Sequence, residues 1–435
     1  MHRAQGCALL GSVLMLAAAS TEAREMNFLV DSSLGWDSNV FQRSARTRSD
    51  GYWEFSPRVI VRDSRDELEY DVRYRPTFQA FFNEDNIDID DWDHNARVDI
   101  DWLATPADTL TLGGSITRTR VVRQFQDDPA SITPPDRDEF ILTESDREII
   151  LRSLARLGYR RSFSASLSGQ FDFSFEDIDY RSDQSVDSRS YSASAGLTGL
   201  FNSRTQGGFS ATGRIRQGRG IDFLPSPVVG QFSSRTLTGD FSFFVLRLLT
   251  PSLSLSLRAG PSITQTEQDA PPSRQFGLVL DPLTGEPEIK RIRGRTSSEQ
   301  SVSFVADASL EKQWRRSTGK IGYTRFESGT GGSSSASIVD QVTVSLNHRP
   351  APRVTINLVV SWNQREVISD LESSVQSDSR RYSGTAAASY AITRQVSILG
   401  RFSYRQFEDK NTTTSKTEII LGSIIFRYSF DPVRF

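Results

Sequence analysis

Residues 163–175 carry the most restrictive pattern in the chain. They read Phe-Ser-Ala-Ser-Leu-Ser-Gly-Gln-Phe-Asp-Phe-Ser-Phe, with apolar or small residues at every odd position and polar residues at every even position. A period of two places successive side chains on opposite faces of a β-strand. A strand that crosses a bilayer at a tilt needs about 9–11 residues. We therefore predict a single strand over residues 163–175, with one apolar face and long enough to span a membrane.

The same alternation recurs along the rest of the chain, and the connections are alternately long and short, starting with a long one. Outer-membrane barrels have an even number of antiparallel strands, long outside loops and short periplasmic turns. We predict an all-β fold, a transmembrane antiparallel up-and-down β-barrel of about 18 strands with both termini in the periplasm. The alternative, a soluble all-β sandwich or solenoid, gives no reason for the alternating lengths. The predicted strands cover residues 28–37, 53–61, 68–74, 96–102, 109–120, 149–157, 163–175, 191–197, 209–215, 237–245, 253–259, 302–310, 321–323, 342–346, 354–362, 382–390, 396–404 and 420–430.

The composition agrees with this prediction. Only 37% of the 435 residues are hydrophobic, and the formal net charge is -3. Outside the N-terminus no run reaches the roughly 18 apolar residues of a membrane-spanning helix. A transmembrane barrel has this composition because half of each strand faces water.

The N-terminus has the pattern of a secretory signal peptide. Arg3 supplies a positive charge, residues 8–19 are apolar, and residues 21–23 form a small-residue cleavage site. We therefore predict a signal peptide over residues 1–23 and an outer-membrane β-barrel over residues 24–435. The sole cysteine, Cys7, lies in the signal, so disulfide and thiolate-metal chemistry are excluded for the mature chain.

The inward positions predict a hydrated lumen. A barrel of sixteen to eighteen strands leaves an aqueous channel, and the polar faces here carry small hydroxyl residues and both signs of charge. Such a wall suits a hydroxyl-rich, weakly charged polymer or sugar, although any one of these residues could serve only to keep the lumen wet. The candidate lumen-lining residues are Asp99, Asp101, Arg214, Arg216, Arg258, Arg401 and Arg405.

The longest connection is a candidate constriction. Residues 264–298 form a loop longer than loop-length statistics favour, and it carries Lys290, Arg291, Arg293 and Arg295. We predict that this loop folds inward and narrows the channel. A solvated outer face is the plainer interpretation of such a basic run.

The sequence predicts no metal site, no cofactor and no enzyme. The acidic residues Asp85, Asp88, Asp90, Asp91 and Asp93 have carboxylates that calcium prefers, but their spacing matches no calcium-binding loop. Two histidines, His94 and His348, follow the predicted signal. A barrel hydrolase that uses His94 with a serine is the alternative to a channel, but no nucleophile elbow, phosphate loop or zinc-binding helix is present.

The beginning and the end of the predicted barrel carry short motifs. Residues 35–41 read Gly-Trp-Asp-Ser-Asn-Val-Phe, and residues 55–57 read Phe-Ser-Pro, ahead of Leu68, Tyr70 and Tyr74. These motifs and the strand layout resemble a family of outer-membrane β-barrel porins associated with exopolysaccharide gene clusters. The terminal Phe435 resembles the signal that barrel-assembly machinery reads.

The resemblance implies a function and partners. It implies a passive port that exports a secreted polysaccharide and works with a periplasmic polysaccharide-export protein. The alternative function is a general or sugar-uptake porin, which needs no partner. The other expected contacts are outer-membrane lipid, lipopolysaccharide and the barrel-assembly machinery, and no nucleic acid is expected. The resemblance transfers no catalytic residue.

Overall fold

The computed structural model describes residues 25–39, 47–83, 92–119, 149–180, 187–223, 229–270, 276–280, 287–291, 295–329, 336–367, 379–409 and 416–434. These residues form strands joined by turns. The first eleven strands are β1 Glu25–Asp37, β2 Asp50–Ser64, β3 Leu68–Phe81, β4 Asp93–Thr105, β5 Asp108–Thr119, β6 Ile150–Ser164, β7 Leu167–Tyr180, β8 Asp187–Asn202, β9 Thr205–Phe223, β10 Val229–Thr250 and β11 Leu253–Ala270. The others are β12 Phe276–Leu280, β13 Pro287–Arg291, β14 Arg295–Trp314, β15 Ser317–Gly329, β16 Ala336–Ala351, β17 Val354–Val367, β18 Ser379–Ala391, β19 Val396–Asp409, β20 Lys416–Ser429 and β21 Val433–Arg434.

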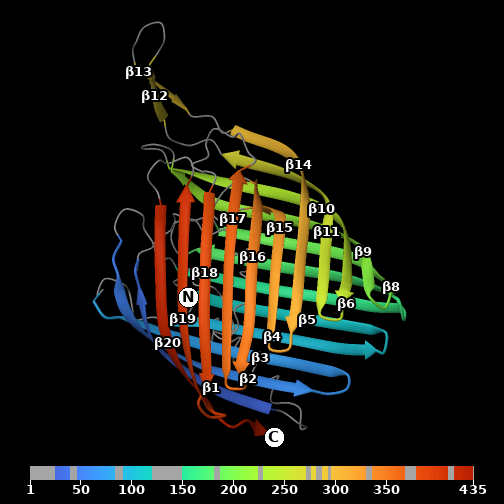
Figure 1. Cartoon of the computed structure of the whole chain (residues 1–435). Coiled ribbons are helices and arrows are strands. Elements are labelled where there is room, and N and C mark those ends of the chain that lie inside the picture. Colours follow the sequence, from blue (N-terminus) through green and yellow to red (C-terminus); the bar gives the residue numbers. More distant parts are fainter. Residues whose placement is uncertain are drawn as a thin grey trace.

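Eighteen long strands, β1–β11 and β14–β20, form one closed barrel. Each pairs antiparallel with the next, and β1 closes the barrel because it pairs with β2 on one edge and with β20 on the other. Closure leaves neither β1 nor β20 as a free edge. The predicted fold class is therefore confirmed, and every predicted strand corresponds to one of these eighteen (Figure 1).

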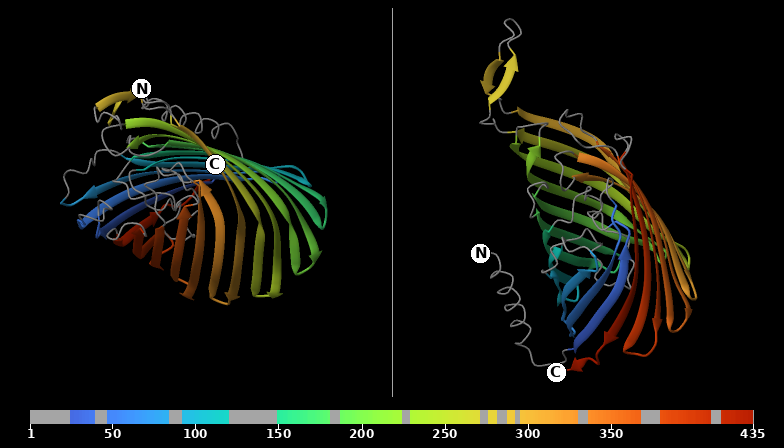
Figure 2. Two further views of the ribbon diagram at one scale, coloured as in Figure 1. Left: turned by 90° about the horizontal axis from the view of Figure 1, so that it is seen from above. Right: turned by 90° about the vertical axis from the view of Figure 1, so that its left-hand side faces the viewer.

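The connections alternate as predicted. Short turns occupy one end of the barrel, and β1 begins and β20 ends at that same end (Figure 2). The longer connections, at residues 38–49, 82–92, 120–149, 181–186, 224–228, 271–294, 330–335, 368–378 and 410–415, all leave from the other end. A small separate hairpin, β12 paired with β13, belongs to one of them. The location of the short-turn end in the periplasm stays a prediction that follows from the pattern of outer-membrane barrels.

One predicted strand is wrong in its bounds. Residues 163–175 do not form one strand, because β6 ends at Ser164 and β7 begins at Leu167. Just before this turn the register shifts from Ser162↔Ser168 to Ser164↔Leu167. Because of this bulge, even-numbered residues of β6 pair with even-numbered residues of β7. The polar residues therefore stay at even positions in both strands, and the alternation passes through the turn without changing phase. A period of two therefore does not reveal a turn of this kind.

The two faces of the wall differ in chemistry. Outward-facing apolar side chains are exposed, as with Phe243 at 60% and Val302 at 74%, while the neighbouring inward residues Ser242 and Ser262 are both at 0%. The described side chains that are less than 2% exposed are all polar. A soluble protein has the opposite arrangement. The exposed apolar band requires lipid around it, so the fold is a transmembrane barrel. No helix among the described residues is long and apolar enough to cross a bilayer.

A buried ion pair lies where the barrel closes. Asp31 of β1 is opposite Arg427 of β20 in the register. The Arg427 guanidinium donates hydrogen bonds to both Asp31 carboxylate oxygens, at 2.7 and 3.1 Å. Arg58 of β2 lies 3.9 Å from the same carboxylate. Asp31 is 4% exposed, so this carboxylate connects the first, second and last long strands in a poorly solvated site.

We predict that Asp31→Asn lowers the stability of the folded barrel by about 3 kcal/mol, because it leaves the poorly solvated cations without their anion. The measurement is urea-induced unfolding in lipid vesicles. Asp172→Asn is the matched control, since among the described residues Asp172 accepts a single long hydrogen bond, 3.5 Å from Ser194. Equal unfolding midpoints for the two variants would show that the closure does not depend on Asp31.

A second prediction concerns Gly260 of β11. A Cβ atom there would lie 1.8 Å from the Phe241 carbonyl oxygen of β10, so the two backbones could not keep their spacing. We expect Gly260→Ala to cost at least about 3 kcal/mol and to reduce the heat-modifiable folded form seen on gels. Gly213 of β9 is the control, because a Cβ there meets nothing within 4 Å. Normal folding of Gly260→Ala would contradict this prediction.

Candidate functional site

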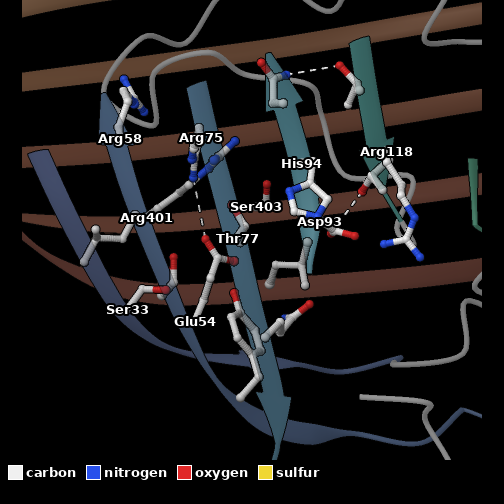
Figure 3. Close-up of a pocket in the computed structure, with 18 of the residues that line it drawn as sticks. Ser33, Glu54, Arg58, Arg75, Thr77, Asp93, His94, Arg118, Arg401 and Ser403 are labelled. Carbon is white, nitrogen blue, oxygen red and sulfur yellow. Dashed lines mark hydrogen bonds and ion pairs between the residues drawn. The ribbon is translucent and has the colours of Figure 1, made fainter. Parts of the chain in front are cut away.

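A recess on the inner wall, lined by residues of seven strands, brings together charged side chains. Its cavity volume is about 190 Å³, and it is formed by β1–β5 together with β19 and β20 (Figure 3). Strands from both ends of the sequence meet here because β1 pairs with β20. The residues that line it are Ser33, Tyr52, Glu54, Arg58, Arg73, Arg75, Thr77, Gln79, Asp93, His94, Asn95, Thr117, Arg118, Thr119, Arg401, Ser403, Arg405, Leu421, Ser423 and Ile425.

Almost all of these residues share the inward phase of their strands. On β2 the inward side chains are at even positions, because the odd positions carry Trp53, Phe55 and Val59 outward. On β3 the inward side chains are at odd positions, which gives Arg73 and Arg75. The alternation of each strand therefore decides which arginines enter the lumen.

The recess carries an excess of positive charge. Five inward arginines, Arg58, Arg73, Arg75, Arg401 and Arg405, accompany two carboxylates, those of Glu54 and Asp93. Arginine stays protonated at all physiological pH values. The excess of guanidinium groups makes this part of the lumen attractive to anions.

Local contacts hold several of these guanidiniums in place. Arg75 donates to the Ser56 hydroxyl at 2.6 Å and lies 3.7 Å from a Glu54 oxygen, as the dashed line in Figure 3 shows. Arg73 donates to both oxygens of Asp71, at 2.6 and 3.0 Å. Held guanidinium groups lose less conformational entropy when a ligand binds. Their fork of donors matches the oxygens of a carboxylate or a phosphate.

The wall formed by β8–β11 has a different character. Here the inward positions are mainly hydroxyls, and its arginines donate to them. Arg258 donates to Ser242 at 2.7 Å and to Ser210 at 3.3 Å, and Arg216 donates to Ser188 at 3.2 Å. This hydroxyl wall, residues 188–198, 210–216, 234–242 and 254–266 at their inward positions, offers both donors and acceptors to a neutral polar solute.

The structure separates the candidate lumen-lining residues into three groups. Arg401 and Arg405 belong to the recess, and Arg214, Arg216 and Arg258 belong to the hydroxyl wall. The remaining two lie on β4 in the inward phase. Asp99 accepts from Arg97 at 2.6 Å, and Asp101 accepts from Thr111 at 2.6 Å. Their roles in transport stay predictions.

The sequence analysis did not name the other half of the recess. Arg58, Arg73 and Arg75 were absent from the candidate residues, and so was Glu54. Their inward phase was readable from the alternation on strands β2 and β3. Their nearness to Arg401 and Arg405 was not readable, because it depends on barrel closure.

The predicted loop over residues 264–298 has the wrong bounds. Its first residues extend β11 to Ala270, and Arg295 begins β14. Lys290 and Arg291 lie in β13, while Arg293 is outside the described residues. Figure 1 shows the β12–β13 hairpin beyond the end of the barrel. A constriction by this loop stays a prediction.

The two histidines lie in strands β4 and β16, outside the inward phase of each strand. His94 shares the outward phase of β4 but still borders the recess, and its Nδ1 shares a 3.0 Å hydrogen bond with the Tyr74 hydroxyl. His348 lies near the short-turn end, where its Nδ1 shares a 2.7 Å hydrogen bond with Ser317.

The acidic residues near position 90 are the candidate calcium ligands. Asp93 begins β4 and accepts a hydrogen bond from Thr119 at 3.2 Å, while Asp85, Asp88, Asp90 and Asp91 lie outside the described residues. Among the residues the structure describes, no group of three or more His, Cys, Asp or Glu is placed to hold a metal ion.

These features define the class of protein. A closed barrel of eighteen strands, apolar outside and charged inside, is the architecture of outer-membrane channels. The chain is an outer-membrane β-barrel with a polar, charged interior.

No family model matches the chain, and no curated protein does. Among solved structures, it is similar to the open form of Fiu, the ferric-catecholate import receptor of E. coli K12, with a TM-score of 0.48 and 9% identity over 94% of this chain and 82% of that one. It is also similar to OpdK of Pseudomonas aeruginosa, solved with vanillate, with a TM-score of 0.44 and 10% identity over 94% and 98% of the two chains. OpdQ of the same species gives a TM-score of 0.44 and 10% identity over 95% and 100%. These values are too low to assign a family or a substrate.

The recess predicts the ionic selectivity of the channel. We expect the double substitution Arg401→Gln and Arg405→Gln to lower the ratio of chloride to potassium permeability about 3-fold. The reason is that it removes two of the positive charges that attract anions. The measurement is the reversal potential in planar bilayers under a salt gradient.

The matched control removes two lumen charges elsewhere. Arg214→Gln with Arg216→Gln has the same net change but leaves the recess intact, so its effect should be smaller. Equal shifts for the two double variants would show that the overall lumen charge, and not the recess, sets the selectivity.

Proposed function

We propose that this barrel is a passive outer-membrane channel for small hydrophilic solutes, with a preference for anionic ones such as sugar acids. One observation carries the proposal: six arginines and two carboxylates line a single recess of the channel wall. The recognition chemistry is simple, because guanidinium groups bind carboxylates through paired hydrogen bonds.

The arginine recess and the hydroxyl wall would recognise different parts of the solute. The arginines attract the charged group of the solute, and the hydroxyl wall exchanges hydrogen bonds with its hydroxyl groups. Conduction requires binding that favours entry yet still permits release. Water in a wide lumen weakens each charge pair, so the solute is held loosely and moves down its concentration gradient.

Export of a polysaccharide is the second candidate. The observation that favours it is the hydroxyl wall, since a neutral, hydroxyl-rich polymer needs hydrogen bonds more than charge. The resemblance seen in the sequence implies the same function, with a periplasmic export protein as partner. The arginine recess favours the first candidate, because a neutral polymer gains nothing from an excess of cations.

Swelling of liposomes that contain the purified barrel tests the proposal. We expect glucuronate to enter faster than glucose, and we expect the double variant Arg401→Gln and Arg405→Gln to lose this preference while still admitting glucose. The physical reason is that the variant removes charge from the recess without closing the lumen. The Arg214→Gln and Arg216→Gln variant serves as the control and should retain the preference.

The two candidate functions give opposite results. Barrels that admit neither sugar, together with loss of cell-surface polysaccharide when the gene is deleted, would favour the export function. Entry of both sugars, together with unchanged surface polysaccharide, would support the first candidate, a passive channel for small solutes.

A further inference from the structure

The barrel wall contains a seam where two strands stop pairing. Strands β14 and β15 form a regular ladder from Trp314↔Ser317 to Ala306↔Arg325. Beyond that point β14 continues to Arg295 and stays paired with β11, and β15 continues to Gly329 and stays paired with β16. Figure 1 shows the outer part of β14 curving away from the straight run of β15. Within the described part of the chain, no strand pairs with this edge of β14.

The seam begins at the height of the lipid-facing band. The outward apolar residues of β14 run from Leu310 to Val302, and the ladder ends at Ala306, within this run. Val302 is 74% exposed and Phe304 is 53% exposed, and Ile263 beside them on β11 is 50% exposed. An open sheet edge is unfavourable in hydrocarbon, because its backbone groups cannot bond to water there. Something other than a backbone ladder must therefore complete the wall.

Side chains bridge the seam. Glu327 of β15 is 6% exposed and accepts three hydroxyl hydrogen bonds, from Ser262 at 3.0 Å and from Ser301 and Ser303 at 3.2 Å each. The Arg325 guanidinium lies over the Phe304 ring, 4.6 Å from its centroid. These contacts connect β15 to β11 and β14 without fixing the backbones to one another. Side-chain contacts of this kind can separate without disturbing the ladders on either side.

We propose that the β14–β15 seam is a lateral portal between the lumen and the outer leaflet, and that it takes a single-chain amphiphile with a hydrogen-bond-donating, cationic head group. The seam is polar on its lumen side and apolar on its lipid side, which matches the polar head and apolar chain of such a molecule. The Glu327 carboxylate and its serines would receive the head group from the lumen side. The exposed Val302, Phe304 and Ile263 would contact the alkyl chain from the lipid side. This portal is separate from the arginine recess, so it stands whether or not the channel prefers anions.

A cysteine lock tests the portal. The next pair in the β14–β15 register would be Val305 with Phe326, so Val305→Cys with Phe326→Cys should form a disulfide that closes the seam. The matched control is Ser309→Cys with Gly322→Cys, inside the ladder, where a Cβ at Gly322 would lie 3.7 Å from the Ser309 Cβ. Both pairs are made in a Cys7→Ser background, since Cys7 is the one cysteine of the sequence.

The probe is a long-chain alkylamine with a photoreactive group at its head, added to proteoliposomes. If the head group passes through the seam, its photoreactive group should label lumen-facing residues next to Glu327, including Ser301 and Ser303. We expect this labelling in the wild type and in the oxidised control pair, and we expect its loss in the oxidised Val305–Phe326 pair and its return on reduction. Labelling that persists in the locked barrel, or that is absent from the wild type, overturns the proposal.

A second variant keeps the proposal testable if the outer pair does not cross-link. Glu327→Gln retains the shape of the side chain and removes its charge, so labelling by the alkylamine should decrease. Unchanged labelling in Glu327→Gln would overturn the assigned role of this carboxylate. Small-anion conductance should be unchanged in all these variants, which separates a failure of the portal from a failure of the channel.

Discussion

Backbone hydrogen bonding without water is the constraint on which this structure depends. A strand in hydrocarbon must pair along both of its edges, because no solvent can satisfy its amide and carbonyl groups. The pairing of β1 with β20 meets this requirement for the two strands that would otherwise be edges. Asp31 and Arg427 add a charged contact across the same junction. The absence of a free edge at β1 and β20 and the enclosed lumen both follow from closure.

Closure also creates the candidate site. Arg401 and Arg405 lie near the end of the sequence, whereas Arg58 and Arg75 lie near its beginning, and they line one recess because the last strands adjoin the first. No short segment of the chain could assemble this group. The hydroxyl wall, by contrast, comes from consecutive strands β8–β11, so its chemistry is local. The channel therefore has a charged wall made by closure and a neutral wall made by sequence neighbours.

The constraint is relaxed at specific places. Bulges beside several short turns shift the register by one residue, which lets the alternation continue from one strand into the next. A larger departure from complete backbone pairing occurs at the β14–β15 seam. There, hydrogen bonds between Glu327 and three serines connect the strands where the backbone ladder has ended. Side-chain contacts in place of a backbone ladder connect the two strands while leaving their backbones free to move relative to one another. A site where a barrel can open is most easily built from such contacts.

The sequence by itself determined the strand number, the inward and outward faces and the order of long and short connections, because a period of two is a local property that each segment carries alone. It did not reveal the turn at residues 165–166, since the bulge preserves the period across it. It also placed Thr264 in a loop, where the structure extends β11. Only the tertiary structure decided which inward side chains meet and where β14 leaves β15. Register and closure join residues far apart in the chain, and no local pattern records such pairings.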